Sequence, residues 1–175
     1  MTDPGDAFLV LLAQAGDREA LGQLLAAVQP RLRSYLRMVT GDGADADDVL
    51  QDTFVIAVRK LRFLRDPAVF RPWLYRIATR EAHRRRQPRE LALDAATEPA
   101  SAEDFECAAL AAEAGERLRA AVAGLPDRAR EVVALHYFED MALDEIAAVL
   151  DAPLGTIKSR LAYGLSRLRK DTGVK

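Results

Sequence analysis

Arginines recur at every fourth position in the middle of this chain, and the chemistry open to them is anion binding. If this segment is helical, Arg76, Arg80 and Arg84 lie on one flank, which His83 extends. Positions 71 to 89 hold seven arginines and a single acid. Guanidinium groups without acidic partners repel one another, whereas a phosphate backbone neutralises them. We therefore expect this flank to contact nucleic acid.

A second basic surface is expected near the end of the chain. On a helical wheel that starts at Thr156, the leucines and Ile157 share one face. Small hydroxyl side chains at the helix start permit close approach to phosphates, which a helix N-terminus also favours. Arginine and tyrosine one turn later can reach base edges, and further cations would neutralise phosphates. The residues predicted to bind DNA are Thr156, Lys158, Ser159, Arg160, Tyr163 and Arg167.

A short helix predicted at residues 143–150 would position this basic helix. Ile146 and Leu150 face the same core as the apolar side of the last helix, and a short turn with Pro153 and Gly155 joins the two. That spacing is typical of a helix-turn-helix, whose second helix enters the DNA major groove. A plain antiparallel helix pair with a solvated basic face fits the wheel equally well. The wheel alone leaves both interpretations open.

A polar and acidic motif precedes Phe54. A helix here would direct Val49 and Phe54 inward and leave Asp48, Gln51 and Asp52 on an exposed flank. Acids near a helix N-terminus are also favoured by the helix dipole, which would explain them without any partner.

The elements that must position these residues are all predicted to be helical. Apolar residues recur at three- and four-residue spacing, without the alternation of a half-buried strand, so an all-α fold is expected. Asp17 and Asp45 are predicted N-caps, and Pro30 is expected to bend the second helix. Helices are expected at residues 7–14, 18–40, 46–63 and 67–86, and again from about residue 109, with breaks at 124–126, 139–142 and 151–155.

The composition is that of a globular protein, with half of the residues hydrophobic and 30% charged. The net charge of −2 conceals a basic segment at residues 71–89 and an acidic one at residues 90–116. The acidic segment holds eight acids and neither lysine nor arginine. The apolar run AFLVLLAQA is too short to span a bilayer, and acids stand where a signal peptide has a basic head. A cytoplasmic protein without membrane insertion is therefore expected.

Catalytic and metal chemistry find little support in the sequence. Cys107 is the only cysteine, so neither an internal disulfide nor a thiolate zinc cluster is expected. His83 and His136 lack companions at ligand spacing. No nucleophile stands beside a base, and no glycine-rich loop is present to hold phosphates. The sequence predicts no enzyme, no metal site and no cofactor.

Residues 125–170, LPDRAREVVALHYFEDMALDEIAAVLDAPLGTIKSRLAYGLSRLRK, resemble the fourth conserved region of bacterial sigma factors of the extracytoplasmic-function (ECF) group. The resemblance rests on LP…REV…L, on EIA…L and on P.GT.KSRL. It implies that the helix-turn-helix binds the minus thirty-five promoter element. The small hydroxyl side chains at the start of the last helix, and the arginine and tyrosine one turn later, independently favour DNA contact by the same residues.

Residues 45–86 are similar to the second conserved region of the same family, through DDVLQDTF and then F..WLYRIA. The similarity implies that Asp48, Gln51 and Asp52 dock on the clamp helices of the largest polymerase subunit. Charge matching there would set register and association rate more than affinity.

The same similarity implies that Arg76, Arg80, His83 and Arg84 contact the minus ten element. In the family an unstacked base is captured there during melting, which needs a pocket and a basic track for the single strand. The turn RFLRDPAVFRP is the expected specificity loop.

The resemblance implies an all-α sigma factor with two small helical domains, which directs promoter recognition, DNA melting and transcription initiation. Its partners would be RNA polymerase core, through the clamp helices and the flap, promoter DNA and an anti-sigma factor. The polymerase would supply all chemistry. The predicted division is a first domain at residues 1–87, a flexible acidic linker at 88–111 and a second domain at 112–175.

Two positions depart from the family pattern. Ala142 stands where a serine or threonine N-cap is usual, at a cost of about 1 kcal/mol. Arg80 and Arg84 replace the asparagine and aspartate often found in the last helical turns. The base preferred at the minus ten element therefore stays open, although contact with DNA is still expected.

Two other functions remain alternatives. An ordinary helix-turn-helix regulator would dimerise on an operator, and it would leave the motif at residues 47–54 unexplained. A sigma mimic would bind an anti-sigma protein and never DNA, which the polar face around Arg160 disfavours. An enzyme ranks last, because the acids expected for a pocket fall on helix exteriors.

Overall fold

The computed structural model of the protein describes residues 4–41, 43–90 and 118–172. These residues form helices joined by turns and contain no strand, so the predicted all-α class is confirmed. Most of the predicted linker at 88–111, together with the helical start expected near residue 109, lies outside the described residues. The helices are α1 (Pro4–Gln14), α2 (Arg18–Thr40), α3 (Gly43–Lys60), α4 (Phe70–Glu90), α6 (Asp127–Tyr137), α7 (Leu143–Leu150) and α8 (Leu154–Thr172), with short 3-10 turns η1 (Leu61–Phe63) and η2 (Pro67–Val69).

The start of α2 confirms the predicted cap. The Asp17 carboxylate accepts hydrogen bonds from the amides of Glu19 and Ala20, at 2.9 and 3.0 Å. Gly41 ends the helix in the left-handed conformation, with φ 74°, which a glycine adopts without steric cost. Pro30 lies inside this continuous helix.

The predicted cap at Asp45 is wrong. Because Gly41 already reverses the chain, α3 begins at Gly43, and Asp45 falls inside its first turn. There the carboxylate faces the helix dipole favourably and lies 3.9 Å from Arg85. The α-helix also ends at Lys60, since the last predicted turn tightens into η1.

The fourth predicted helix also starts differently. Pro67 opens η2, in which the Asp66 carboxylate accepts a hydrogen bond from the Ala68 amide at 2.9 Å. The α-helical part begins only at Phe70 and continues to Glu90. The loop that holds η1 and η2 is anchored to α1, because the Gln14 amide donates to the backbone carbonyls of residues 61 and 64.

A four-helix assembly of α1 to α4 buries the first core. Leu24, Leu32 and Leu36 of α2 meet Val49 of α3 and Leu74 of α4, all fully buried. Removing these apolar side chains from water is the main force that holds the helices together.

Helices α6 to α8 form a smaller second unit around Leu135, Ile146 and Ile157. The breaks between them fall where the sequence predicts, although Gly155 already lies within α8. Gly164 of α8 faces α6, and a β-carbon on it would lie 2.8 Å from a methyl group of Val133. The two helices therefore approach more closely than any larger residue would allow.

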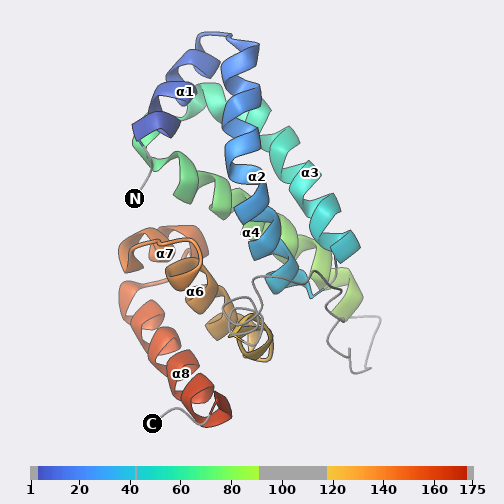
Figure 1. Cartoon of the computed structure of the whole chain (residues 1–175), viewed down its shortest axis with the longest axis vertical. Coiled ribbons are helices and arrows are strands. Elements are labelled where there is room, and N and C mark those ends of the chain that lie inside the picture. Colours follow the sequence, from blue (N-terminus) through green and yellow to red (C-terminus); the bar gives the residue numbers. More distant parts are fainter. Residues whose placement is uncertain (1–3, 42, 91–117, 173–175) are drawn as a thin grey trace, which may run out of the picture.

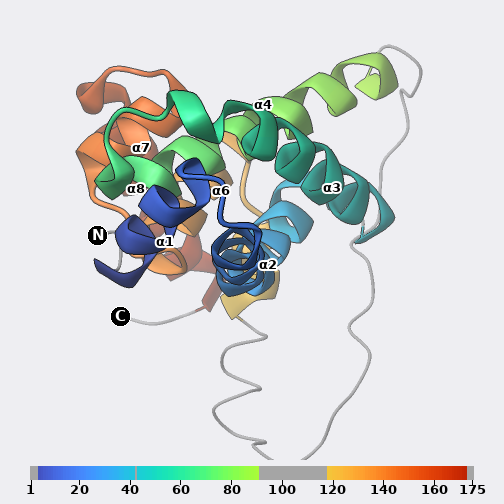
Figure 2. The ribbon, with the colours of Figure 1, turned by 90° about the horizontal axis from the view of Figure 1, so that it is seen from above.

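The two units pack against each other. In Figures 1 and 2, α4 lies between α3 on one side and α7 on the other. Helix α6 contacts α2, where Arg130 lies 3.5 Å from the Val39 carbonyl. None of the helices in the described part of the chain is long and apolar enough to cross a membrane.

Candidate nucleic-acid interface

The turn between α7 and α8 fixes how the basic helix is presented. Asp151 ends α7 in the left-handed conformation, with φ 51°, and the Pro153 carbonyl accepts hydrogen bonds from the amides of Thr156 and Ile157. Ile157 is fully buried, so the opposite face of α8 turns outward. This geometry is that of a helix-turn-helix with an accessible second helix.

The polar face of α8 is open to solvent. Tyr163 is 50% exposed, and Ser159 donates its hydroxyl hydrogen to the Thr156 carbonyl at 2.9 Å. Among the described residues, neither Arg160 nor Arg167 forms an ion pair. These five residues share one face, which retains its positive charge.

Lys158 does not belong to that face. At 3.6 residues per turn it projects to the other side of α8 from Thr156 and Arg160, although its side chain is exposed. The structure thus brings together five of the six residues predicted to bind the minus thirty-five element.

The arginine flank of α4 has acidic partners, although the sequence predicted that it would have none. Arg76 and Arg80 approach the Asp151 carboxylate at 3.8 and 3.5 Å, and His83 Nε2 lies 2.5 Å from Glu131 Oε1. The sequence argument failed because these acids belong to α6 and the α7–α8 turn, far along the chain. Of the four predicted residues, these three face the second unit.

Arg84 lies apart from the other three. It is paired with Glu81 at 2.5 Å on its own helix and with Asp52 of α3 at 4.0 Å. Its side chain is 70% exposed and turned toward α3. The basic residues of the α4 flank therefore contact two different neighbours, the second unit and α3.

A buried polar pair lies under the second unit. Tyr75 of α4 donates a hydrogen bond to the carboxylate of Glu139, which is 4.0 Å from Arg31. Burial raises the pKa of Glu139, while the Tyr75 hydroxyl and the Arg31 charge act in the opposite direction. Burial also raises the pKa of Tyr75, and the charge of the neighbouring Glu139 carboxylate raises it further.

The residues predicted to dock on polymerase do not form one surface. Asp48 and Asp52 turn toward α4, where both carboxylates contact Arg85. Gln51 instead faces α2, at the wall of a groove. The structure separates the two acids from the amide because they project from different sides of α3.

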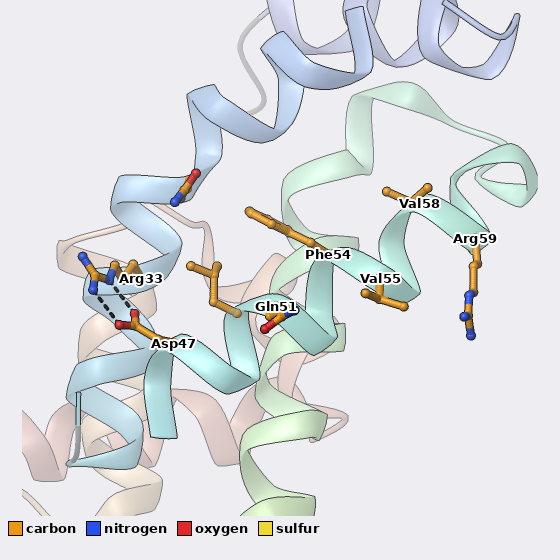
Figure 3. Close-up of a pocket in the computed structure, with 9 residues that line it drawn as sticks. Arg33, Asp47, Gln51, Phe54, Val55, Val58 and Arg59 are labelled. Carbon is orange, nitrogen blue, oxygen red and sulfur yellow. Dashed lines mark hydrogen bonds and ion pairs between the residues drawn. The ribbon is translucent and has the colours of Figure 1, made fainter. Parts of the chain in front are cut away.

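The groove between α2 and α3 has a volume of about 720 Å³ (Figure 3). Phe54, expected in the core, is only partly buried and lines the groove together with the exposed Val55 and Val58. The other lining residues are Gln29, Arg33, Asp47, Leu50, Gln51 and Arg59.

An ion pair lines one end of the groove. The Arg33 guanidinium donates two hydrogen bonds to the Asp47 carboxylate, each 2.6 Å long (Figure 3). The Arg33 hydrogen bond holds the pKa of Asp47 below its ordinary value. Apolar walls with a charged end resemble the core and rim of a protein-binding surface.

Sequence reasoning missed the apolar part of this groove. The signal was present, since Val55 and Val58 lie one turn apart on the face of α3 that also carries Gln51. It also missed Glu131, Glu139 and Asp151, which no local pattern marks as partners of α4. Within the described ranges, no group of three or more histidine, cysteine or acidic side chains is arranged to hold a metal ion.

Comparison with known proteins matches both halves of the chain. Residues 24–90 match the family described as Sigma-70 region 2, and residues 121–170 match the family described as Sigma-70, region 4. The ECF RNA polymerase sigma-E factor of Escherichia coli (strain K12) is 32% identical over 173 residues, covering 89% of this chain and 88% of that protein.

Solved structures agree with this likeness. The structure of CnrH in complex with the cytosolic domain of CnrY has a TM-score of 0.71 at 28% identity, and the match covers 98% of this chain and 99% of CnrH. The sigma factor RpoE, solved in complex with the anti-sigma factor NepR from Bartonella quintana, has a TM-score of 0.72 over 88% of this chain and 97% of RpoE. At 24% identity, that second likeness concerns the fold.

The two regions occur in the family's order, and each coincides with one of the two helical units. A relative with nearly one third of its residues identical aligns along most of both chains. The chain belongs to the ECF sigma factors, the proteins that direct RNA polymerase to promoters and initiate transcription.

Proposed function

We propose that this sigma factor reads the minus thirty-five element with the polar face of α8. The observation that carries the proposal is the charge of that face: in the described part of the chain, Arg160 and Arg167 have no acidic partner. Tyr163 is half exposed between them, one turn along the helix. An uncompensated basic face beside a helix N-terminus attracts phosphates, and its longer side chains reach base edges.

Polymerase core is proposed to dock on the groove between α2 and α3. Val55 and Val58 are 43% and 46% exposed, and they lie beside Phe54, Gln51 and the Arg33–Asp47 pair. An apolar centre inside a polar rim suits a helical partner, and the family resemblance names the clamp helices of the largest subunit. By the same resemblance, the second unit would meet the flap.

The minus ten element is proposed to contact α4 and the loop before it. Phe63 is 66% exposed at the loop, with the Arg62 guanidinium 4.5 Å from the centre of its ring. An exposed aromatic ring beside a cation suits an unstacked base and its phosphate. Arg76, Arg80, His83 and Arg84 would continue the track for the single strand.

Regulation by a partner is part of the proposal. RpoE is bound by an anti-sigma factor in its solved structure, and we propose a partner of that class for this chain. We also propose that the protein acts in the cytoplasm, where polymerase and promoter meet, and that the core performs all catalysis.

Transcription in vitro tests the proposal. Purified core polymerase, with and without the protein, would be supplied with DNA from upstream of the protein's own gene. Specific transcripts should appear only when the protein is present, and Arg160→Ala should weaken them at least about tenfold, as loss of one good base contact does. Arg18→Ala is the matched control, since Arg18 is exposed at the start of α2 and, among the described residues, forms no ion pair.

The same assay separates the alternatives. Binding to core without transcripts would favour a sigma mimic. DNA binding without binding to core would favour an ordinary regulator and would contradict the docking proposal.

A further inference from the structure

Helix α1 lies before the range that matches Sigma-70 region 2, which begins at residue 24, so that match gives the helix no role. In Figure 1 it lies against the segment that joins α3 to α4, where it contacts both η1 and η2. That segment carries Phe63, the exposed ring proposed to meet an unstacked base. The contacts of α1 therefore affect how this ring is presented.

One side chain of α1 holds the backbone on both sides of the pair Arg62 and Phe63. The Gln14 amide nitrogen donates hydrogen bonds to the Leu61 carbonyl at 2.9 Å and to the Leu64 carbonyl at 2.8 Å. Carbonyl oxygens only accept hydrogen bonds, so both hydrogens of this amide are used and its orientation is set. The Leu64 amide also donates to the Leu61 carbonyl, at 3.0 Å, which closes the turn.

The side chains of this turn point in opposite directions. Leu61 is 5% exposed and Leu64 is partly buried against the core, whereas Phe63 is 66% exposed. Arg62 is also exposed, and its guanidinium lies 4.5 Å from the centre of the Phe63 ring. The two leucines and the Gln14 hydrogen bonds therefore hold the backbone, while the cation and the aromatic ring project into solvent.

The end of α1 that carries Gln14 has a defined geometry of its own. Gly16 follows it with φ 98°, a left-handed conformation that suits glycine. The Gly16 amide donates to the Ala13 carbonyl and the Asp17 amide to the Leu12 carbonyl, each at 3.1 Å, which is the Schellman arrangement of a helix C-terminus. Because α2 begins directly afterwards, a shift of Gln14 would disturb two helices.

A buried ion pair joins the first turn of α1 to the other end of the loop. The Asp6 carboxylate is 5% exposed and accepts a hydrogen bond from Arg71 Nε at 2.6 Å. A carboxylate is seldom buried without such a partner. Arg71 follows Phe70, the buried first residue of α4. Helix α1 thus holds the loop at both of its ends.

We propose that Gln14 is a positioning residue for base capture at the minus ten element. It acts through the loop rather than by contact with DNA, because it orders the backbone on either side of Arg62 and Phe63 before DNA binds. A loop that is fixed in advance loses less conformational freedom on binding, and a ring held in one place discriminates between bases more sharply than a mobile one. The inference rests on the proposed contact of this loop with the minus ten element.

Three substitutions of Gln14 separate hydrogen-bond donation from side-chain shape. Gln14→Met keeps the length of the side chain and removes both donors. Gln14→Glu places a carboxylate against two carbonyl oxygens, which repel it. Gln14→Lys supplies N–H donors again on a side chain long enough to reach the same carbonyls. Gln23→Met on α2 is the matched control, because Gln23 is exposed and its amide donates to Glu19 of the same helix, at 3.4 Å.

The quantity to measure is base discrimination by the holoenzyme of core polymerase and the full-length protein. Fluorescence anisotropy would measure binding to nontemplate-strand oligonucleotides from upstream of the start site that transcription in vitro maps. Each base is substituted in turn, and the position at which Phe63→Ala removes a preference marks the base that the ring meets. A ratio of two affinities measured with one preparation is unaffected by any loss of folded protein.

At that position the wild-type holoenzyme should prefer its base about tenfold, as one good base contact allows. Gln14→Met and Gln14→Glu should lower this preference to about twofold, while Gln14→Lys and Gln23→Met should keep it near the wild-type value of about tenfold. Base preferences at the minus thirty-five element, measured on duplex promoter DNA, should not change in any of these variants, since α8 is proposed to read that element.

Other outcomes overturn the inference in distinguishable ways. If Phe63→Ala changes no preference, the proposed contact of the loop with the minus ten element is wrong, and the positioning role fails with it. If Phe63→Ala removes a preference that Gln14→Met keeps, or if Gln14→Met weakens binding equally for every base, the positioning role alone is wrong. Loss of the preference in Gln14→Lys as well would contradict donation to the two carbonyls as its cause.

Discussion

Tyr75 of α4 donates its hydroxyl hydrogen to the carboxylate of Glu139, and both side chains are buried between the two helical units. The pair is 64 residues apart in the sequence. A buried carboxylate costs free energy unless it is neutral or well paired, so this contact makes the packing of the two units sensitive to pH.

The pH dependence of stability should change with Glu139→Gln. Burial raises the pKa of Glu139 above its ordinary value of 4.5, so the ionised form is favoured in the unfolded chain. The stabilising contribution of this group is complete below that ordinary pKa and is lost as the pH rises toward the raised one. The glutamine variant lacks this loss, so its stability relative to wild type should be constant below pH 4.5 and should rise progressively above it.

Urea unfolding across that pH range measures the difference. Tyr75→Phe serves as the opposing control, because it removes the hydrogen bond that lowers the pKa of Glu139 and should steepen the loss. A constant difference between wild type and Glu139→Gln at every pH would contradict the prediction.

Gly164→Ala should destabilise the second unit by about 1–3 kcal/mol, the usual cost of overpacking. The new β-carbon would lie 2.8 Å from a Val133 methyl group, which forces α6 and α8 apart. Gly155→Ala on the same helix meets nothing within 4 Å and should be neutral or stabilising. The melting temperature should therefore fall for Gly164→Ala and stay unchanged or rise for Gly155→Ala, and Val133→Ala should partly rescue Gly164→Ala.

Val58→Glu should weaken binding to polymerase core at least about tenfold, or roughly 1.4 kcal/mol, by placing a charge in an apolar contact. Val58 is exposed in the groove, so folding should be unaffected. Leu11→Glu introduces the same charge at an exposed apolar position on α1, away from the groove. Binding of each variant to surface-immobilised core would be measured. Equal losses of binding in both variants would show that the groove is not the docking site.

Ala142→Ser should stabilise α7 by about 1 kcal/mol. Ala142 has extended backbone angles at the N-cap and offers no side-chain acceptor, while its amide already donates to the Glu145 carboxylate at 2.8 Å. A serine hydroxyl would complete the reciprocal pair of capping bonds. Ala148→Ser, inside the same helix, should slightly lower the melting temperature; a similar fall for Ala142→Ser would exclude the capping explanation.

Local sequence patterns were enough to predict the helices and most of their limits. Helical periodicity, the Asp17 cap and the breaks around α6 to α8 depend on neighbours within a few residues, and those interactions are visible in a single chain. The open face of α8 could be predicted for the same reason, because a helical wheel separates the buried Ile157 from the exposed Tyr163 without any tertiary information. The cap at Asp45 failed where an adjacent glycine turn shifted the helix start.

The contacts of the α4 flank depend on how the helices pack in three dimensions. His83 and Glu131 are 48 residues apart, and Arg80 and Asp151 are 71 apart, so no local pattern pairs them. The groove beside α3 likewise requires α2, since an exposed valine on one helix says nothing of its neighbour. The sequence shows which side chains are charged and which are apolar. Whether those side chains are neutralised, covered or left open depends on which helices pack together, and that packing is set by the burial of both cores.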